Sequence, residues 1–370
     1  MKEKIKIPFA KPDITLEDIQ AVNNFLLNCD GQLTDGEMVS DFENKFSNYI
    51  DKASSYCIAT SSCTSALHLA YMALGIGSGD EVIVPAMTHA ATAHAVELVG
   101  AKSIFIDCKS DGNIDEFLIR KELEGNRSIK VISVMHYVGN PCLMDLICDR
   151  AKEYGVRVVE DCALALGSRL KGKHVGLLGD CGAFSFYPAK HITTGEGGMF
   201  VTTDYDLYRR AKSICRFGKE DERSSSDYNI DKLGSNFRMS ELQAVLGISQ
   251  LKRRDKFLEV RQRNLSKLLY LNNGININIF GSSYCAILKC DTVYSRNEII
   301  DKLKKKEIQA SIYYPHPIPR LKYYANKYGY APIRYPEAIR IADTTIALPI
   351  GPHVTEEMMS YMIECLKEIL

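Results

Sequence analysis

The sequence predicts an α/β protein, with a large domain at residues 1–257 and a smaller α+β domain at residues 258–370. Short apolar runs at 103–106, 131–135 and 156–159 are typical of buried strands, and segments with helical spacing of apolar residues separate them. Alternating β and α elements imply a mainly parallel sheet that is covered by helices on both faces.

The composition indicates a globular protein without a strong net charge. The chain has 370 residues, 46% of them hydrophobic, which is enough for a large core. Lysine plus arginine and aspartate plus glutamate both number 46, so no overall charge attracts the chain to nucleic acid or to a membrane. The N-terminus lacks the apolar run of a secretory signal, and no segment approaches the roughly 20 apolar residues of a membrane span. We therefore expect a cytoplasmic protein.

Twelve cysteines are scattered along the chain. None forms a Cys-x-x-Cys pair, and their spacings match no common zinc site. A disulfide framework is not expected without a secretory signal. We expect reduced, mostly buried thiols and no metal site.

The N-terminal part is expected to form two helices, a strand and a third helix. Thr15 begins a pattern of helical spacing, a turn at 31–36 follows, and a second helix occupies 39–50. A strand at 56–59 then runs into the hydroxyl-rich segment 60–65, which opens the third helix. Such a helix start is either an ordinary cap or, because its amides are free and the helix dipole is positive there, an anion site.

The middle of the chain continues the alternation. A strand at 81–85 leads through His89 into a helix, and further helices are expected at 116–123 and 143–154. His89 is placed to cap its helix, to be buried, or to face a ligand. His136 lies at the end of a strand. Its side chain either faces the functional site or has a purely structural role, and the sequence leaves both alternatives open.

The stretch from 179 to 200 reads as a strand, a tight polar turn rich in glycine, and a second strand. Lys190 lies on the connection, between Pro188 on one side and glycines on the other. A loop lysine taken at random is a solvated side chain. Rigid backbone and small neighbours instead favour an amine that is held for Schiff-base chemistry.

Upstream, the apolar run at 156–159 ends in Glu160 and Asp161. The carboxyl end of a parallel strand is where α/β sheets present functional groups. A surface acidic pair is the ordinary alternative, but the following residues 163–167 are uncharged and mostly apolar, which indicates a crevice. A carboxylate, a hydroxyl cluster and a later lysine are the set that pyridoxal phosphate (PLP) requires: the lysine forms an imine, Asp161 keeps the pyridine nitrogen protonated, and hydroxyls with helix amides hold the phosphate.

The last third predicts a helix at 205–215, a polar surface loop at 219–232 and a long amphipathic helix at 236–257. The elements expected in the small domain are strands at 284–288, 308–314 and 345–348 and helices at 296–305 and 356–370.

Several motifs in order resemble the DegT/StrS family of PLP-dependent nucleotide-sugar aminotransferases. They are Ser-Ser-Cys-Thr-Ser-Ala-Leu-His at 61–68, Glu160-Asp161, the segment 184–198, and Asn-Phe-Arg-Met-Ser-Glu at 236–241. The resemblance extends from about Pro8 to the end of the chain. It implies fold type I, as in aspartate aminotransferase, with a mainly parallel seven-stranded sheet, and a homodimer with shared active sites.

The resemblance also assigns roles to particular residues. Lys190 and Asp161 are catalytic, His89 replaces an aromatic ring that stacks on the pyridine, and Asn236 reaches the cofactor of the other subunit. The residues implied to hold the phosphate are Thr64, Ser65 and Ser185, and those implied to bind substrate are Thr34, Tyr313 and His316. Two positions depart from the family pattern, because Cys63 stands for a glycine and Leu164 for a glutamine.

The implied activity is transfer of an amino group from an amino acid, L-glutamate in most of the family, to a keto carbon of a nucleotide-linked sugar. The commonest substrates in the family are 4-keto-6-deoxy sugars that become precursors of surface polysaccharides such as O-antigen. A PLP-dependent sugar dehydratase of the same fold is an alternative, but that branch has histidine where Lys190 stands, so transamination is favoured. A non-catalytic PLP-binding regulatory protein is an alternative of another class.

Overall fold

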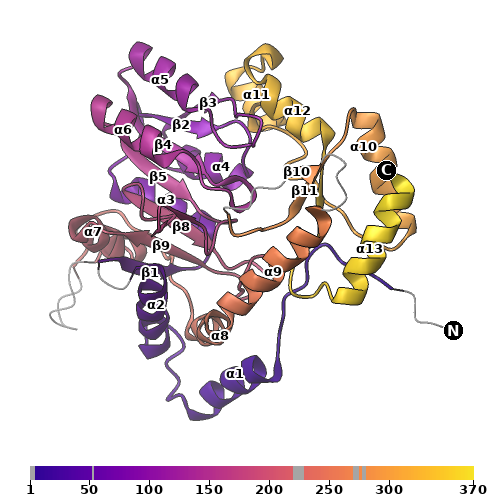
Figure 1. Ribbon diagram of the computed structural model, residues 1–370. Coiled ribbons are helices and arrows are strands. Elements are labelled where there is room, and N and C mark those ends of the chain that lie inside the picture. The colour runs from indigo at the N-terminus through magenta and orange to yellow at the C-terminus, as the bar shows by residue number, and fades with distance from the viewer. Residues whose placement is uncertain (1–4, 52–53, 220–228, 270–274, 277–280) are drawn as a thin grey trace.

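The computed structural model describes residues 5–51, 54–219, 229–269, 275–276 and 281–370. A seven-stranded sheet in the order β1-β9-β8-β5-β4-β2-β3 forms the centre of the larger part (Figure 1). Only β9 runs antiparallel to its neighbours, so the expected mainly parallel sheet is confirmed. Its strands are β1 (Tyr56–Thr60), β2 (Glu81–Pro85), β3 (Lys102–Ile106), β4 (Ile129–Met135), β5 (Arg157–Asp161), β8 (Cys181–Ser185) and β9 (Gly198–Thr202).

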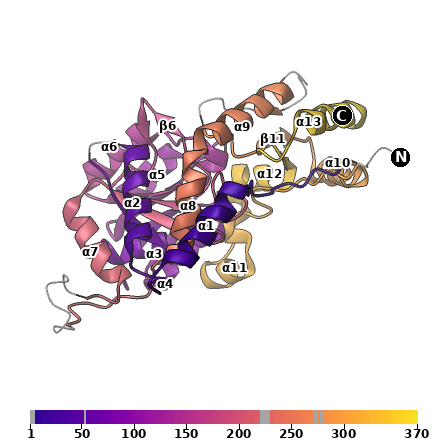
Figure 2. The same ribbon diagram turned by 90° about the horizontal axis from the view of Figure 1, so that it is seen from below.

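Helices connect these strands and cover both faces of the sheet (Figures 1 and 2). The helices of this part are α1 (Leu16–Asn28), α2 (Glu37–Ile50), α3 (Cys63–Ala73), α4 (Ala90–Leu98), α5 (Glu116–Gly125), α6 (Met144–Tyr154) and α7 (Tyr205–Cys215). They begin within a few residues of the expected starts. Thr15 forms the capping box of α1 with Asp18, as the sequence indicated. A short hairpin of β6 (Arg169–Leu170) and β7 (Lys173–His174) was not expected.

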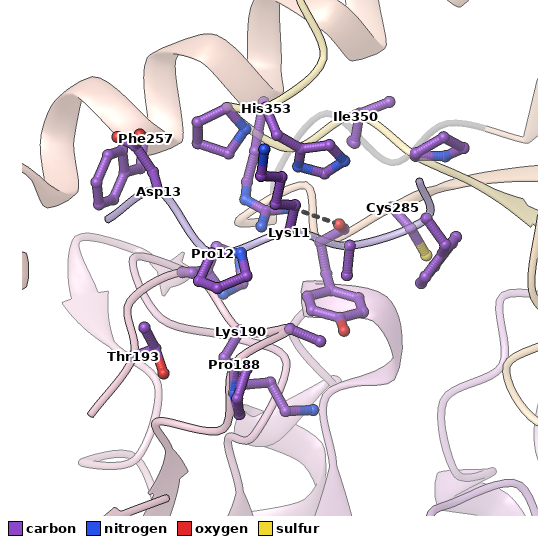
Figure 3. A pocket seen from close by; sticks show the side chains of 18 of the residues that line it. Lys11, Pro12, Asp13, Pro188, Lys190, Thr193, Phe257, Cys285, Ile350 and His353 are labelled. Carbon is purple, nitrogen blue, oxygen red and sulfur yellow. Dashed lines mark hydrogen bonds between the residues drawn. The ribbon is translucent and has the colours of Figure 1, made fainter. Parts of the chain in front are cut away.

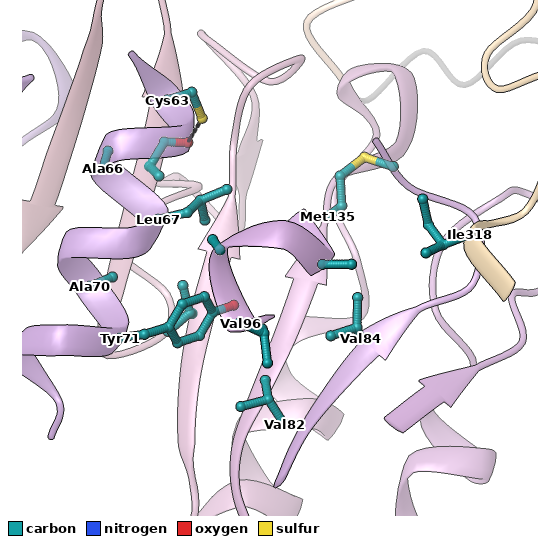
Figure 4. Close-up of a cluster of buried hydrophobic side chains, with 14 of the residues drawn as sticks. Cys63, Ala66, Leu67, Ala70, Tyr71, Val82, Val84, Val96, Met135 and Ile318 are labelled. Atoms are coloured by element: carbon teal, nitrogen blue, oxygen red, sulfur yellow. Dashed lines mark hydrogen bonds between the residues drawn. The ribbon is translucent and has the colours of Figure 1, made fainter. Parts of the chain in front are cut away.

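Alternate side chains of one strand enter different apolar clusters. In β2, Val82 packs in the cluster that contains Leu67 and Tyr71 of α3 (Figure 4). Its neighbour Ile83 instead joins Ile147 of α6 in a cluster on the opposite face. This period of two is the pattern of a strand that is buried on both faces, and it explains why the sequence shows continuous apolar runs there.

The expected long helix at 236–257 is wrong. The chain forms α8 (Glu241–Lys252) and α9 (Arg254–Leu269), which are separated at Arg253. Ser240 caps α8 in a capping box with Gln243, so the preceding residues stay extended and pair with Arg216 and Thr60. The expected boundary after residue 257 therefore falls inside α9.

The C-terminal part contains an antiparallel sheet of β10 (Ile275–Asn276), β11 (Ala286–Lys289) and β12 (Thr345–Leu348). The expected strand at 308–314 is wrong, because only the isolated bridges Ile7 to Ile308 and Ser311 to Ala347 form there. Pro315 and Pro317 cannot donate to a ladder, and the chain turns away from the sheet edge before them. The helices are α10 (Val293–Lys305), α11 (Lys322–Tyr328), α12 (Pro336–Thr344) and α13 (Glu356–Ile369).

Other expectations concern cysteines, membrane spans and one loop. All twelve cysteines are free, and nine of them are buried, so the expectation of mostly buried cysteines is confirmed. Among the described residues, no helix has the length and apolar character needed to cross a membrane. The polar loop expected at 219–232 lies largely outside the described residues.

Candidate active site

Lys190 lies on the connection between β8 and β9, as expected. Its backbone amide donates to Tyr187 O at 2.8 Å, and its side chain is half-buried. Nζ lies 5.2 Å from the centre of the Tyr284 ring. Burial lowers the pKa of Lys190, and the negative charge of Asp161 opposes this shift. Lys190 lines one pocket together with Lys11 and Pro12 (Figure 3).

Asp161 is the last residue of β5 and is 2% exposed. Oδ2 accepts a hydrogen bond from the Thr92 hydroxyl at 2.7 Å, and Oδ1 accepts one from the Ala163 amide at 3.0 Å. Within the described part of the chain, no lysine, arginine or histidine forms an ion pair with Asp161. A buried carboxylate without a protein cation fits a ligand that brings its own positive charge, such as the protonated pyridine of PLP.

His89 caps α4 and lies near Asp161. Its Nδ1 accepts a hydrogen bond from the Ala91 amide at 3.1 Å, so the proton of the neutral ring lies on Nε2. Burial lowers the pKa of His89, against the opposing charge of Asp161. The ring centre is 5.7 Å from that of Tyr314. The capping role is thus present, and stacking on the cofactor stays a prediction.

The first turn of α3 gathers the hydroxyl groups expected at the phosphate. Ser62 caps the helix by accepting the Ser65 amide at 3.1 Å, and its hydroxyl lies 2.9 Å from that of Ser65. The amides of Cys63 and Thr64 precede the first amide that donates within the helix, that of Ala66, and are open to an anion. A Cβ on Gly198 would come within 2.5 Å of Cys63 N, so only glycine permits this approach of β9 to α3. Since Gly198 pairs with Ser185, the expected phosphate residues meet at one corner.

The two departures from the family pattern have different consequences. Cys63 occupies the first helical position of α3, where no positive φ is needed, and its thiol lies 3.6 Å from Ala183 O. The helix start is therefore formed without a glycine. Leu164 is 1% exposed and packs in the apolar cluster of Val159, so its side chain offers the cofactor no hydrogen bond.

Tyr313 and His316 occupy different environments. The Tyr313 hydroxyl lies 2.8 Å from the hydroxyl of Tyr284, and its carbonyl accepts a hydrogen bond from Tyr137. Tyr313 is therefore fixed beside the ring that Lys190 contacts. His316 is exposed, with Nδ1 3.5 Å from Nη1 of Arg320.

Thr34 and Asn236 are both exposed and lie together on another surface. Thr34 pairs with Ser240, and Oδ1 of Asn236 accepts a hydrogen bond from Arg238 Nε at 3.1 Å. Among the described residues, neither forms a hydrogen bond or ion pair with Lys190 or Asp161. This surface adjoins the Lys190 loop, because Gln243 donates to Glu196 O at 2.7 Å.

Glu160 and His136 form a buried network that the sequence left unassigned. Nε2 of His136 lies 3.0 Å from Glu160 Oε2, and Nδ1 accepts the Cys142 amide at 3.1 Å. Glu160 also accepts the amides of residues 176, 178 and 179 at 2.7 to 2.8 Å. His136, Glu160 and Cys162 are close enough to share a metal ion. Because both ring nitrogens and both carboxylate oxygens are already engaged, the structural alternative for His136 is favoured.

We expect Glu160→Gln to destabilise the protein by about 2 to 4 kcal/mol, because the new amide would present donors to donor groups in a buried site. The measurement is the free energy of unfolding in urea, followed by circular dichroism. Glu153→Gln, at an exposed ion pair with Arg150, is the matched control and should unfold with wild type. Equal stability of all three proteins would show that the network is dispensable.

Sequence reasoning missed Thr92, Tyr284 and Arg261. Thr92 of α4 follows Thr88, which precedes the helix, by four residues, and their hydroxyls lie 2.7 Å apart, which is a weak signal in retrospect. Tyr284 lies beside Lys190, and Arg261 contacts Tyr284, through tertiary packing that leaves no local signature in the sequence.

The sheet topology, with a lysine and a buried carboxylate at its carboxyl edge, defines a fold-type-I PLP-dependent enzyme. Residues 12–367 match the model of the DegT/DnrJ/EryC1/StrS aminotransferase family, and the chain belongs to this family. It is an aminotransferase, and PLP is its cofactor.

Similar proteins and a solved structure support this assignment. The chain is 34% identical over 374 residues to GDP-perosamine synthase of Escherichia coli O157:H7, covering 98% of each chain. It is 41% identical over 257 residues to the UDP-4-amino-4,6-dideoxy-N-acetyl-beta-L-altrosamine transaminase of Campylobacter jejuni serotype O:23/36, covering 69% of this chain and 67% of that protein. The structure of the putative sugar aminotransferase Spr1654 of Streptococcus pneumoniae in its PMP form matches with a TM-score of 0.91 and 28% identity, covering 99% of this chain and 98% of that one. The expected family, fold, enzyme class and cofactor are confirmed.

Proposed function

We propose that the protein transfers the amino group of an amino acid, L-glutamate, to a keto carbon of a nucleotide-linked sugar in the synthesis of a surface glycan precursor. The observation that carries this proposal is the half-buried Lys190 amine. It lies beside the Tyr284 ring and close enough to the buried Asp161 carboxylate for the two charges to interact. Bound PLP supplies a carbonyl and an electron-accepting ring. Lysine at position 190 disfavours the dehydratase alternative.

Each residue has a defined task in this proposal. With PLP bound, the Lys190 amine would hold the cofactor through its carbonyl and would carry a proton to or from the reacting substrate carbon. Asp161 holds a proton on the ring nitrogen. The first turn of α3, with Thr64 and Ser65, and Ser185 bind the phosphate, and His89 covers one face of the ring. Beyond the ring, the proposed sugar contacts are Tyr313, His316 and Thr34.

We infer C4 of a 4-keto-6-deoxy sugar as the acceptor. The name of the Campylobacter jejuni relative describes an amine at C4 and no hydroxyl at C6. A relative from Acidithiobacillus ferrooxidans, 32% identical over 85% of this chain, is named a 3-aminotransferase, so amination at C3 is the competing outcome. The test is a panel of UDP- and GDP-linked 3-keto and 4-keto sugars, incubated with PLP and L-glutamate, with the position of the new amine read by NMR. Turnover of a 3-keto sugar alone would overturn the C4 assignment.

We propose that the protein is a homodimer with shared active sites. Leu16 and Leu27 of α1 are 73% and 77% exposed, and Leu233, near Asn236 in the chain, is 84% exposed. Exposed apolar side chains on this scale favour a protein partner. A second copy of the chain on this surface would bring its Asn236 toward the phosphate of its neighbour.

The shared site predicts complementation between two inactive variants. Asn236→Asp places a negative charge beside the partner's phosphate, which carries about two charges, and Lys190→Ala removes the amine. In a mixed dimer one site carries both lesions and the other carries neither. After refolding equal amounts together, activity should return to roughly a quarter of wild type by random pairing. No recovery, with subunit exchange verified by mass spectrometry, would assign Asn236 to its own chain or to no site.

A further inference from the structure

Two cationic side chains lie against one aromatic ring beside the catalytic position. The Tyr284 ring, just before β11, is 3% exposed. Lys190 Nζ lies 5.2 Å from its centre, and Arg261 Cζ of α9 lies 5.7 Å from it. The Tyr284 hydroxyl is held by Tyr313 at 2.8 Å, so the ring has a fixed position between the two parts of the chain.

Arg261 is buried and lacks a carboxylate partner. It is 6% exposed, and its Nη1 donates to Tyr284 O at 2.7 Å. Its Nε has no hydrogen-bond partner, and no aspartate or glutamate among the described residues forms an ion pair with it. The nearby ion pairs of α9 belong to other residues. An unpaired charge in a region of low dielectric acts on its neighbours over a longer distance than a surface charge does.

Titratable groups of several elements face Lys190, and Lys11, Asp13 and His353 line the same pocket as Lys190 and Arg261. Burial raises the pKa of the Cys63 and Cys285 thiols and raises the pKa of Tyr284 to about 12. Burial lowers the pKa of His89 and of His191. The Asp161 carboxylate favours the charged ammonium form of Lys190.

We propose that Arg261 acts on Lys190 across the Tyr284 ring and favours the uncharged form of its amine. Arg261 is a positioning residue: its charge opposes the effect of the Asp161 charge on the protonation of Lys190, and it does not touch the reacting atoms. The uncharged amine is the nucleophile that attacks a carbonyl. Each unit by which the amine pKa rises removes about nine-tenths of the free amine at neutral pH. This inference rests on the proposed role of Lys190 in cofactor binding.

The test is a titration of Lys190 in the full-length protein without cofactor. The rate of its acetylation by acetic anhydride, measured by mass spectrometry against a free lysine standard over a range of pH, gives the pKa of the amine. Wild type should titrate below the ordinary pKa of lysine. Arg261→Met should raise the pKa by about one unit, because a nearby positive charge is removed, and Arg261→Lys should stay near wild type. Arg263→Met, at an exposed position of the same helix, is the matched control and should not change it.

Two results would overturn the proposal. One is a folded Arg261→Met protein whose Lys190 pKa is unchanged or lower. The other needs no variant: a wild-type Lys190 that titrates at or above the ordinary lysine value. Because this titration uses neither cofactor nor sugar, its failure is distinct from a failure to aminate sugars, which the substrate panel detects.

Discussion

Lys190→Ala should abolish transamination, with kcat lowered more than about a thousandfold, while the fold is retained. Removing the amine removes both the nucleophile and the proton carrier of the reaction. The side chain is half-buried on a loop and contacts the Tyr284 ring, so its loss leaves little cavity in the core. The measurement is kcat with L-glutamate and the best ketosugar, together with the thermal midpoint of unfolding.

Two further variants sharpen this result. Lys190→Arg keeps the positive charge near Tyr284 but provides no amine of useful basicity, so it should be as inactive as Lys190→Ala. Lys121→Ala, at an exposed position of α5, should retain full activity. Near-normal turnover by Lys190→Ala, without an added amine, would remove Lys190 from the mechanism.

Asp161→Asn should lower kcat by about a hundredfold or more and change the apparent affinity for substrate only modestly. The amide keeps the shape of the side chain but cannot hold a proton on the ring nitrogen. Its oxygen can still accept one of the bonds from Thr92 and Ala163, so the site keeps its outline. Steady-state kinetics that separate kcat from KM provide the measurement.

Thr92→Val is the matched control for Asp161→Asn. It removes one hydrogen bond to the carboxylate at 2.7 Å and leaves the charge, so its loss of turnover should be far smaller. If Asp161→Asn turns over like wild type, another carboxylate protonates the ring. If Thr92→Val is as impaired as Asp161→Asn, orientation of Asp161 matters more than its charge.

Much of the sheet and two central site residues could be predicted from the sequence. Strands buried on both faces appear as apolar runs, so their ends could be located, and the ends of such strands present functional groups. Asp161 was found for this reason. Lys190 was found because proline and glycine mark a rigid connection between two strands.

The features that were missed depend on tertiary packing. In the sequence, nothing distinguishes Arg261 from the other charged residues of its helix. Its burial against Tyr284 arises only in the folded protein. The segment at 308–314 has the composition of a strand, yet Tyr313 forms hydrogen bonds with Tyr137 and Tyr284 instead of pairing in a sheet. The break at Arg253 follows contacts of its guanidinium with Asp18 on α1, at 2.6 Å, which helical spacing does not reveal.

The most direct test of the central claim is the first half of the reaction in the purified protein. After loading with PLP and removal of the excess, L-glutamate is added without any sugar, and the visible absorption band and 2-oxoglutarate are followed together. We expect the band to disappear while one molecule of 2-oxoglutarate forms per chain. A stable band with no oxoacid formed from glutamate or from any other common amino acid would contradict an aminotransferase and favour a protein that binds PLP without catalysis.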